Sequence, residues 1–568
     1  MNSSRQGIVV GLLLGCLSSA FFAQLADSDT VANDPPVDLQ RGLVGHWKLN
    51  GDPKDQSGND NHAKNLGVEL QAAGPDGKPG GKFNGRASYL EVPAHRSWNL
   101  GKRDFSAAAW VCLDRNPDDL PGDLISQYDP VRRRGFHLTI KSNTGVTFNQ
   151  ANDRNLQFSI DDNRETPWID CGRPGKAILA FALAVHDGSL YAGTCEPGKG
   201  ESGRVFRYGG GERWIDCGSP ASSNAVTAMA VFDGHLYVGT GKYRLAGSSL
   251  QESENPHVGG TIFRFDGGKS WIECGKLPNA EAVGGMVVFR GRLYASSLYK
   301  PAGFFRYEGH DKWTDCGTPD GKRVEALGIY NGYLYATSYD GGRVFRFDGK
   351  AWTDCGQLGD PKENTQTYSI AVHHGRLYVG TWRSGRVYRF EDINRWTDVG
   401  RLGQELEVMG MLVHNGRLLA GTLPLAEVYA YDGQTKWARL TQLDHTPEVR
   451  YRRAWTMAEH AGRVFCSTLP SGHVYAYRAG AGVSWDSTFP AGWHHVAAVK
   501  SNDQLKLFVD GKLVGNASFN IADYDLDSNA PLRIGFGAND YFHGRLSDVR
   551  IYQRALHEAE IGGLFRDK

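Results

Sequence analysis

The chain has 568 residues, enough for about three to four average domains. Lysine plus arginine and aspartate plus glutamate both number 63, so the formal net charge is zero, which argues against nucleic acid or an anionic membrane as a general partner, because both require a basic surface. Glycine numbers 72 and aromatic residues make up 11% of the chain, a combination that favours short strands joined by tight turns and excludes a disordered chain.

The first 26 residues have the features of an export signal. Arg5 is a short basic region, residues 8–17 are apolar, and small residues at 18–20 offer a cleavage site. Residues 13–16, Leu-Leu-Gly-Cys, also resemble a bacterial lipobox, in which Cys16 is lipidated after cleavage. The alternative is that Cys16 is an ordinary apolar residue of the signal, since apolar residues continue beyond it.

The sequence therefore predicts an exported protein that is periplasmic, on the cell surface or secreted, with a lipid anchor as one alternative. No later stretch approaches the roughly 18 apolar residues of a membrane-spanning helix, so none is expected once the signal is removed. Residues 27–40 are polar and contain proline, which is typical of a linker.

Residues 41–165 contain strand-like segments without an internal repeat. Apolar residues cluster at 43–49, 89–93 and 105–111, and turn-forming residues fill the stretch 55–63. We interpret this region as the first part of a domain that residues 480–568 complete.

A repeat occupies residues 166–479. Three strand-like strings recur in step, for example at 182–185, 188–194 and 205–208, and Asp-Gly or Asn-Gly turns join the first two. The fourth string is Trp-x-Asp-Cys-Gly, which becomes degenerate in its last copies and begins at Trp168, Trp214, Trp271, Trp313, Trp352, Trp396 and Trp437. Four short strands in each of seven repeats predict a seven-bladed β-propeller.

The order of the strings also predicts how the ring closes. The first Trp string, at Trp168, has no set of three strands before it, and the last set, at 457–477, has no Trp string after it. Pairing these two pieces completes the seventh blade and hides the sheet edges. The four-strand repeats resemble those of kelch propellers.

The cysteines fit packing better than a disulfide framework. A repeat position that accepts cysteine, valine or leucine is a small buried apolar position. It is filled, in chain order, by Cys171, Cys217, Cys274, Cys316, Cys355, Val399 and Leu440. The roles of Cys112 and Cys195 stay open.

The segments on either side of the repeat share motifs with a known family. The second segment holds Trp-His-His-Val-Ala at 493–497, Leu-Phe-Val-Asp-Gly at 507–511 and Asp-Val-Arg-Ile-Tyr at 548–552. In this order they resemble the laminin-G-like, concanavalin A-like jelly roll of the pentraxin type. The resemblance implies an all-β fold in which a two-sheet jelly roll, which usually binds glycans or proteins, is interrupted by the propeller. A guest whose first and last segments pair has the adjacent ends that insertion requires.

We expect function on one face of the propeller. The loops between strands 2 and 3 and between successive blades vary in length, and variable loops on a rigid scaffold usually carry binding. Facing a central funnel, their aromatic and charged residues would suit sugar stacking; the alternative is that they pack loops against one another. The candidate ligand-binding residues are Glu196, Lys242, Tyr243, Tyr299, Tyr339, Asp340, Trp382 and Arg383.

The resemblance to the laminin-G-like family also suggests a structural calcium ion, because such domains often hold one through acidic and carbonyl oxygens. The candidate ligands are Asp55, Asn59 and Asp548. The alternative is a turn rich in aspartate and asparagine. No other cofactor is expected.

The leading hypothesis is an exported, non-catalytic binding protein that recognises a glycan or a cell-surface or extracellular protein through the jelly roll and the variable-loop face of the propeller. The sequence has no Gly-x-Ser-x-Gly, His-Glu-x-x-His or P-loop string. One alternative is a carbohydrate-active enzyme, a hydrolase or lyase, with its site in the funnel; two carboxylates roughly 5–10 Å apart there would favour it. Another is a structural component of a bacterial envelope.

Overall fold

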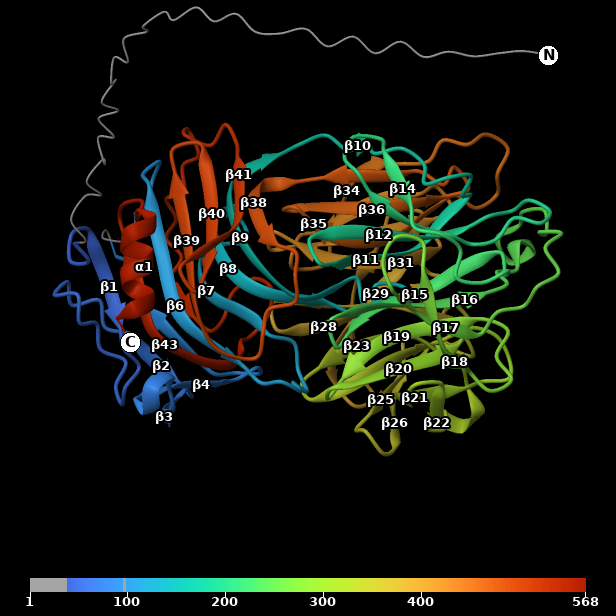
Figure 1. Cartoon of the computed structure of the whole chain (residues 1–568), viewed down its shortest axis with the longest axis horizontal. Coiled ribbons are helices and arrows are strands. Elements are labelled where there is room, and N and C mark those ends of the chain that lie inside the picture. The colour runs from blue at the N-terminus through green and yellow to red at the C-terminus, as the bar shows by residue number, and fades with distance from the viewer. Residues whose placement is uncertain (1–37, 96–98, 568) are drawn as a thin grey trace, which may run out of the picture. The chain divides into compact units, whose positions relative to one another are not determined.

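The computed structural model describes residues 38–95 and 99–567 (Figure 1). The predicted signal peptide, Cys16 and most of the predicted linker lie outside the described residues. Within them the chain is built of β-strands, with one α-helix, α1 (Glu558–Arg566). The all-β fold class is confirmed. No helix in the described part of the chain is long and apolar enough to cross a membrane.

Two antiparallel sheets form a sandwich, and each combines strands from both ends of the chain. The first sheet has the order β3-β4-β43-β6-β39-β40-β41, with β1 paired to β43. Its strands are β1 (Leu43–Trp47), β3 (Glu69–Ala73), β4 (Pro79–Asn84), β6 (Phe105–Leu113), β39 (Gly492–Ser501), β40 (Gln504–Val509), β41 (Lys512–Ser518) and β43 (His543–Tyr552). The second has the order β2-β5-β42-β7-β8-β9-β38. Its strands are β2 (Lys64–Leu66), β5 (Tyr89–Val92), β7 (Gly122–Asp129), β8 (Arg134–Asn143), β9 (Asn152–Glu165), β38 (Ala479–Trp485) and β42 (Leu532–Ile534).

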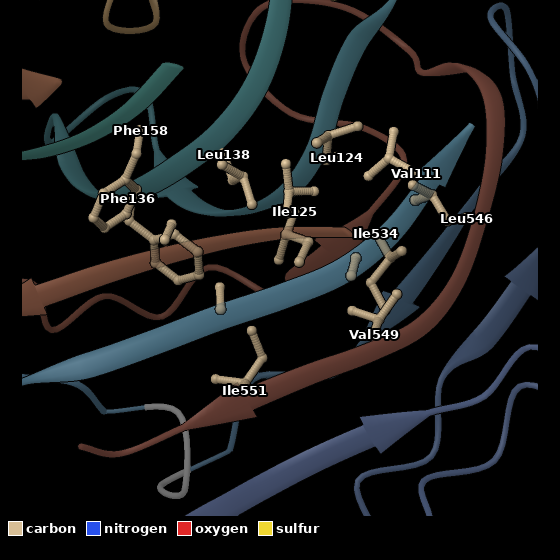
Figure 2. Packing of buried hydrophobic residues seen from close by; sticks show 14 of the residues in the cluster. Val111, Leu124, Ile125, Phe136, Leu138, Phe158, Ile534, Leu546, Val549 and Ile551 are labelled. Atoms are coloured by element: carbon tan, nitrogen blue, oxygen red, sulfur yellow. The ribbon is translucent and has the colours of Figure 1, made fainter. Parts of the chain in front are cut away.

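Apolar side chains of the two sheets meet between them and form the sandwich core. Val111 and Ile551 of the first sheet belong to one buried cluster with Ile125 and Phe136 of the second (Figure 2). Alternate residues of the first sheet face the other way. There α1 covers the sheet, with Leu564 in a second cluster (Figure 1).

Between β9 and β38 the described chain forms seven four-stranded antiparallel units, the blades of the propeller. Each innermost strand lies beside that of the next blade, and the last lies beside the first. The innermost strands are β11 (Leu179–His186), β15 (Ala225–Phe232), β19 (Val283–Phe289), β23 (Val324–Tyr330), β27 (Gln366–His373), β31 (Glu407–His414) and β35 (Arg453–His460). The second strands are β12 (Ser189–Cys195), β16 (His235–Gly241), β20 (Arg292–Ser297), β24 (Tyr333–Ser338), β28 (Arg376–Trp382), β32 (Arg417–Leu423) and β36 (Arg463–Leu469).

The outer half of each blade is its third and fourth strand. The third strands are β13 (Val205–Tyr208), β17 (Thr261–Phe265), β21 (Phe304–Gly309), β25 (Arg343–Phe347), β29 (Arg386–Asp392), β33 (Glu427–Tyr431) and β37 (Val474–Tyr477). The fourth strands are β14 (Trp214–Asp216), β18 (Trp271–Lys276), β22 (Lys312–Asp315), β26 (Trp352–Gln357), β30 (Arg395–Arg401), β34 (Trp437–Gln442) and β10 (Ile169–Asp170). In the seventh blade β10 pairs with β37, so the two ends of the repeat close the ring as the order of strings predicted.

In six of the seven blades the repeated tryptophan ties the blade to the one before it, and Trp168 of the seventh blade has no such bond. The Trp214 indole N–H donates to the carbonyl of Cys171, at 2.9 Å, and the Trp271 indole N–H donates to the carbonyl of Cys217, also at 2.9 Å. The same bond recurs at Trp313, Trp396 and Trp437, and the Trp352 indole N–H donates to the carbonyl of Gly317, one residue further along. The cysteines of the repeat are free, and all but Cys316 are buried, which agrees with a packing role.

The connection between β8 and β9 enters the ring of innermost strands. We call residues 141–152 the hairpin tip. Its Gln150 N–H donates to the carbonyl of Met229 in the second blade, at 3.0 Å. The Thr147 hydroxyl donates to the carbonyl of Trp455 in the seventh, at 2.9 Å. The other five blades are contacted at Val185, Met286, Ile329, Ile370 and Val413.

The hairpin tip thus bonds to the innermost strand of all seven blades. Each of these strands has an inner edge whose N–H and C=O groups would otherwise lack partners in the protein. A segment of the sandwich therefore fills the channel of the propeller. Nothing in the repeat pattern predicted this.

The tight turns between the first and second strands of the blades face the sandwich. The Asn331 N–H donates to a carboxylate oxygen of Asp119, at 3.0 Å. The Tyr128 hydroxyl donates to the carbonyl of Asn415, at 3.2 Å, and the Gly188 N–H to that of Asp486, at 2.9 Å. One face of the propeller is therefore covered, and the variable-loop face is the opposite one.

Candidate functional site: a pocket at the open end of the propeller channel

A pocket of about 260 Å³ lies on the variable-loop face, where innermost strands begin and second strands end. Its floor includes Phe148, from the hairpin tip. The other lining residues belong to the propeller: Tyr243, Arg244, Ala246, Gly247, Glu252, Leu298, Tyr299, Arg323, Tyr339, Tyr368, Arg453 and Trp455.

Aromatic rings form a continuous wall. The Phe148 ring lies 6.0 Å from the Trp455 ring and 6.2 Å from that of Tyr368, centroid to centroid. The Tyr339 ring lies 5.8 Å from Tyr368, and the Tyr243 ring 6.0 Å from Trp455. The Trp455 indole N–H donates to a main-chain carbonyl at 2.9 Å, and the Tyr243 and Ser248 hydroxyls are 2.6 Å apart. The wall is held in place before any ligand binds.

Two arginines at the rim have protein partners. The Arg244 guanidinium lies over the Tyr299 ring, 4.3 Å from its centroid, and bonds to Glu281. The Arg323 guanidinium lies 4.6 Å over the Tyr339 ring. It also forms a two-pronged bond with the carboxylate of Asp340, at 3.0 and 2.6 Å. The charges of both arginines are therefore balanced.

The third arginine, Arg453, differs. It is only 6% exposed, and its Nε and Nη1 atoms have no hydrogen-bond partner in the protein. A carboxylate oxygen of Glu407 lies 4.0 Å from Nε, beyond hydrogen-bond distance. A buried guanidinium without hydrogen bonds is costly unless a ligand supplies them.

Two buried carboxyl groups lie behind the pocket wall. Burial raises the pKa of Glu407 to about 7, although the Arg453 guanidinium acts to lower it. Burial raises the pKa of Glu325 well above its usual range, and neither of its carboxyl oxygens has a partner in the protein. Perturbed carboxyl groups beside a cavity are typical of functional sites.

Three of the residues predicted from the sequence, Tyr243, Tyr299 and Tyr339, line the pocket. Asp340 does not line it but holds Arg323, which does. Their role in ligand binding stays a prediction.

The other four predicted residues lie outside the lining. Glu196 is buried and accepts a bond from the Thr194 hydroxyl, at 2.9 Å, and burial raises its pKa to about 7. Lys242 contacts a neighbouring loop through its main-chain N–H, as does Arg383. The Trp382 ring lies 6.1 Å from Tyr451. These contacts fit the alternative in which such residues pack loops together.

The sequence reasoning missed Arg323, Tyr368, Arg453, Trp455 and the hairpin residue Phe148. A signal was present in the register of the innermost strands. When the innermost strands are aligned, the residue at or directly before the strand start is Leu or Ala in the first three blades and polar in the last four: Leu179, Ala225, Ala282, Arg323, Gln366, Glu407 and Arg453. Phe148 gave no such signal, because it belongs to the sandwich.

A second cavity, of about 530 Å³, lies on the outer face of the first sandwich sheet beside Trp110. Three of its side chains form a network: the His46 Nε2 lies 2.6 Å from an oxygen of Asp548, which also bonds to Arg550 at 3.0 Å. Leu39 and Gln40 are part of its lining.

The predicted calcium ligands have protein partners. Asp55 accepts main-chain bonds from His46, at 2.8 Å, and Ser57, at 2.9 Å, and the Asn59 side chain donates to the carbonyl of Leu43. Among the described residues no group of three or more His, Cys, Asp or Glu side chains could hold a metal ion. Because calcium also takes amide and carbonyl oxygens, calcium at Asp55, Asn59 and Asp548 stays a prediction.

Residues 437–562 match the model of the Laminin_G_3 family, described as the concanavalin A-like lectin/glucanases superfamily. The match includes β38 to β43 of the sandwich, and it begins in β34, which the structure places in a propeller blade. No curated protein matches the chain.

Several solved structures are similar to part of the chain. A catalytically inactive virginiamycin B lyase from Staphylococcus aureus with quinupristin is 9% identical, with a TM-score of 0.41, and the alignment covers 56% of this chain and 99% of that one. YCF48 from Cyanidioschyzon merolae is 13% identical, with a TM-score of 0.39 and coverage of 55% and 99%. The WD40 β-propeller domain of Doa1 is 11% identical, with a TM-score of 0.40 and coverage of 55% and 97%. The chain therefore combines a concanavalin A-like domain, by its family match, with a β-propeller, by its own sheets.

Proposed function

We propose that the protein is a binding protein that takes a saccharide into the propeller pocket. The observation that carries this proposal is the aromatic wall of Phe148, Tyr243, Tyr339, Tyr368 and Trp455 at the open end of a channel that the hairpin tip fills. Sugar rings pack their apolar faces on aromatic rings, and a few polar groups then fix their orientation. The concanavalin A-like family of the sandwich supports a binding role for the chain as a whole.

The size of the pocket limits what can enter. Its volume of about 260 Å³ lies just below the roughly 300 Å³ at which pockets for drug-sized ligands begin. Phe148 closes its floor, so a polymer cannot pass through the channel. The pocket therefore suits the end of a glycan chain.

The lining favours binding over cleavage. Hydrolysis of a glycosidic bond usually requires two carboxyl groups at the bond. Glu252 is the one carboxylate among the described lining residues. It accepts main-chain bonds from Leu245, at 3.3 Å, and Ala246, at 3.2 Å, which hold its loop. Glu325 and Glu407 lie behind the lining, so the hydrolase or lyase alternative would need the wall to move.

Export of the protein and calcium binding by its sandwich are part of the same proposal. Export through residues 1–26, with or without a lipid on Cys16, would place the pocket outside the cytoplasm, where glycans and surface proteins are available. Calcium in the sandwich would stabilise a second binding surface. Mass spectrometry of the mature protein tests the first point, because signal cleavage and lipidation change the mass of its N-terminal peptide in different ways.

A matched pair of variants tests the pocket. Tyr339 directly follows β24 at the open end, and Tyr333 begins the same strand at the other end. Each lies under an arginine, with the guanidinium 4.6 Å from the Tyr339 ring and 4.2 Å from the Tyr333 ring. We expect Tyr339→Ala to weaken binding of a neutral or acidic oligosaccharide about tenfold, and Tyr333→Ala to leave it unchanged.

Binding is measured by calorimetry over a panel of oligosaccharides. The same mixtures are then analysed for cleavage products, which separates binding from catalysis. If Tyr339→Ala binds as tightly as the wild type, the pocket is not the site. If products accumulate, the carbohydrate-active enzyme replaces the binding protein.

A further inference from the structure

Arg453 has N–H groups whose hydrogen bonds the protein does not satisfy. The side chain is more than nine-tenths buried, it lines the pocket, and two of its three nitrogen atoms have no hydrogen-bond partner. Its guanidinium lies 5.6 Å from the Trp455 ring and 5.7 Å from the Tyr451 ring, so aromatic faces hold it without using its N–H groups. The hydrogen-bonding capacity of Nε and Nη1 is therefore not used within the protein.

The other two lining arginines show that this state is particular to Arg453. Arg244 and Arg323 each bond a carboxylate with at least one distance of 2.6 Å. Glu407 is the corresponding partner of Arg453, and it stays 4.0 Å away. Of the three arginines that line the pocket, Arg453 is therefore the one whose guanidinium is not hydrogen-bonded to a carboxylate of the protein.

We propose that the saccharide bound in the pocket carries a carboxylate, and that Arg453 binds this carboxylate. This inference rests on the proposed saccharide binding at the same pocket. A guanidinium presents parallel N–H groups that match the two oxygens of a planar carboxylate. In a buried site of low dielectric constant such a pair is stronger than at the surface. The ligand class is thus the sugar acids, in which the aromatic wall holds the ring and Arg453 holds its acid group.

The position of Arg453 in the sequence supports a recognition role. It is the first residue of β35, and the aligned residue is Leu179, Ala225 or Ala282 in the first three blades. The blades can therefore form with a small or apolar residue at this position. A buried arginine here is not required by the repeat, and it costs stability unless it is bound.

The experiment compares each sugar acid with its neutral counterpart on the whole chain. The probes are oligomers of galacturonate, glucuronate and mannuronate, each paired with the same oligomer after reduction of its carboxyl groups, and sialyllactose paired with lactose. Oligomers bearing sulfate in place of the carboxylate show whether a planar anion is required. The variants are Arg453→Gln, Arg453→Lys and, as a matched control, Arg450→Gln, which removes an exposed positive charge outside the lining.

We expect the wild type to bind at least one acid about ten- to one hundred-fold more tightly than its neutral counterpart. Arg453→Gln should abolish this preference while the affinity for the neutral counterpart stays the same. Arg453→Lys should keep part of the preference, because it keeps the charge without the parallel N–H groups. Arg450→Gln should bind as the wild type does.

Three results would overturn the inference. Equal affinity of the wild type for acid and neutral forms would reject it while leaving saccharide binding intact. An unchanged preference in Arg453→Gln would place the acid elsewhere. Binding of no member of the panel would reject both the inference and the proposed function. Should Arg453→Gln fail to fold, the comparison of acid and neutral ligands on the wild type and on Arg453→Lys still decides.

Discussion

The two ends of the propeller channel hold buried charges in opposite states, on the same two strands. At the closed end, Glu459 of β35 contacts the Lys141 ammonium, and its other oxygen lies 2.8 Å from His414 of β31. At the open end, Arg453 of β35 and Glu407 of β31 are 4.0 Å apart, and Arg453 has nitrogens without partners. One network is complete within the protein, and the other is not.

On the proposal that Arg453 binds a sugar acid, the buried charges at the closed end serve structure and those at the open end serve binding. Burial alone would raise the pKa of Glu459, yet Lys141 and His414 hold it at about 2, so the carboxylate is charged and satisfied. At the open end burial prevails and the pKa of Glu407 is about 7. An arrangement that costs stability persists where it serves binding. Three changes test this reading.

The largest effect is expected at the closed end. Lys141→Met leaves the Glu459 carboxylate buried without its main partner, and it also frees the carbonyl of Val413. The free energy of unfolding should fall by about 3–5 kcal/mol, measured by urea unfolding of the whole chain. In the double variant with Glu459→Met no charge is left unpaired, so much of the loss should be recovered. A loss below about 1 kcal/mol in Lys141→Met would mean that this network does not secure the hairpin tip.

Glu407→Gln should raise the free energy of unfolding, and it should do so only at higher pH. The pKa of Glu407 rises from its ordinary 4.5 to about 7 on folding, so the folded state holds the proton more tightly. The stability it contributes is full below pH 4.5 and is lost as the pH rises to 7. Glu407→Gln should therefore stabilise the chain at pH 8, by about 3 kcal/mol at most, and have little effect near pH 4. A gain that is equal at both values would contradict a titrating Glu407.

The smallest effect concerns ligand binding. The groups that face Glu407 are Arg453, Glu325 and three tyrosines, and burial raises the pKa of Glu325 and of each tyrosine, which keeps them protonated near neutral pH. As Glu407 ionises it competes for Arg453. Affinity for a sugar acid should therefore fall by up to about tenfold between pH 6 and pH 8.

Calorimetry at the two pH values measures this dependence. Glu407→Gln should remove it, and a neutral counterpart of the ligand should not show it in either protein. An affinity for the acid that is the same at both pH values in the wild type would separate Glu407 from the binding event.

Much of the fold could be predicted because the repeat marks its own strands. The Trp strings identify every fourth strand, and the incomplete pieces at Trp168 and at 457–477 complement each other, so closure of the ring followed from their order. The hairpin tip could not be predicted in this way. Thr147 bonds to Trp455, 308 residues away, and a contact of that separation leaves no trace in local periodicity.

The site was predictable only in part, because some of its residues lie where a single copy of the repeat gives no signal. Tyr243, Tyr299 and Tyr339 follow second strands, in the variable loops where the sequence predicts binding residues. Arg453 and Glu407 lie at the start of innermost strands, where the residue type differs between blades, so these two positions are recognised only when the seven copies are aligned in register. Whether the blades are of the kelch type stays a prediction.

The hairpin between β8 and β9 also has a consequence for how the chain is assembled. In the order of synthesis it precedes every blade, and domains generally form from the N-terminus onward. The growing chain thus presents a template with hydrogen-bonding groups for all seven inner strands before the first of them is made. The strands that complete the sandwich, β38 to β43, are made after the last strands of the ring, β35 and β37. A propeller expressed without residues 41–165 would lack its template, so the two domains should fold as one unit.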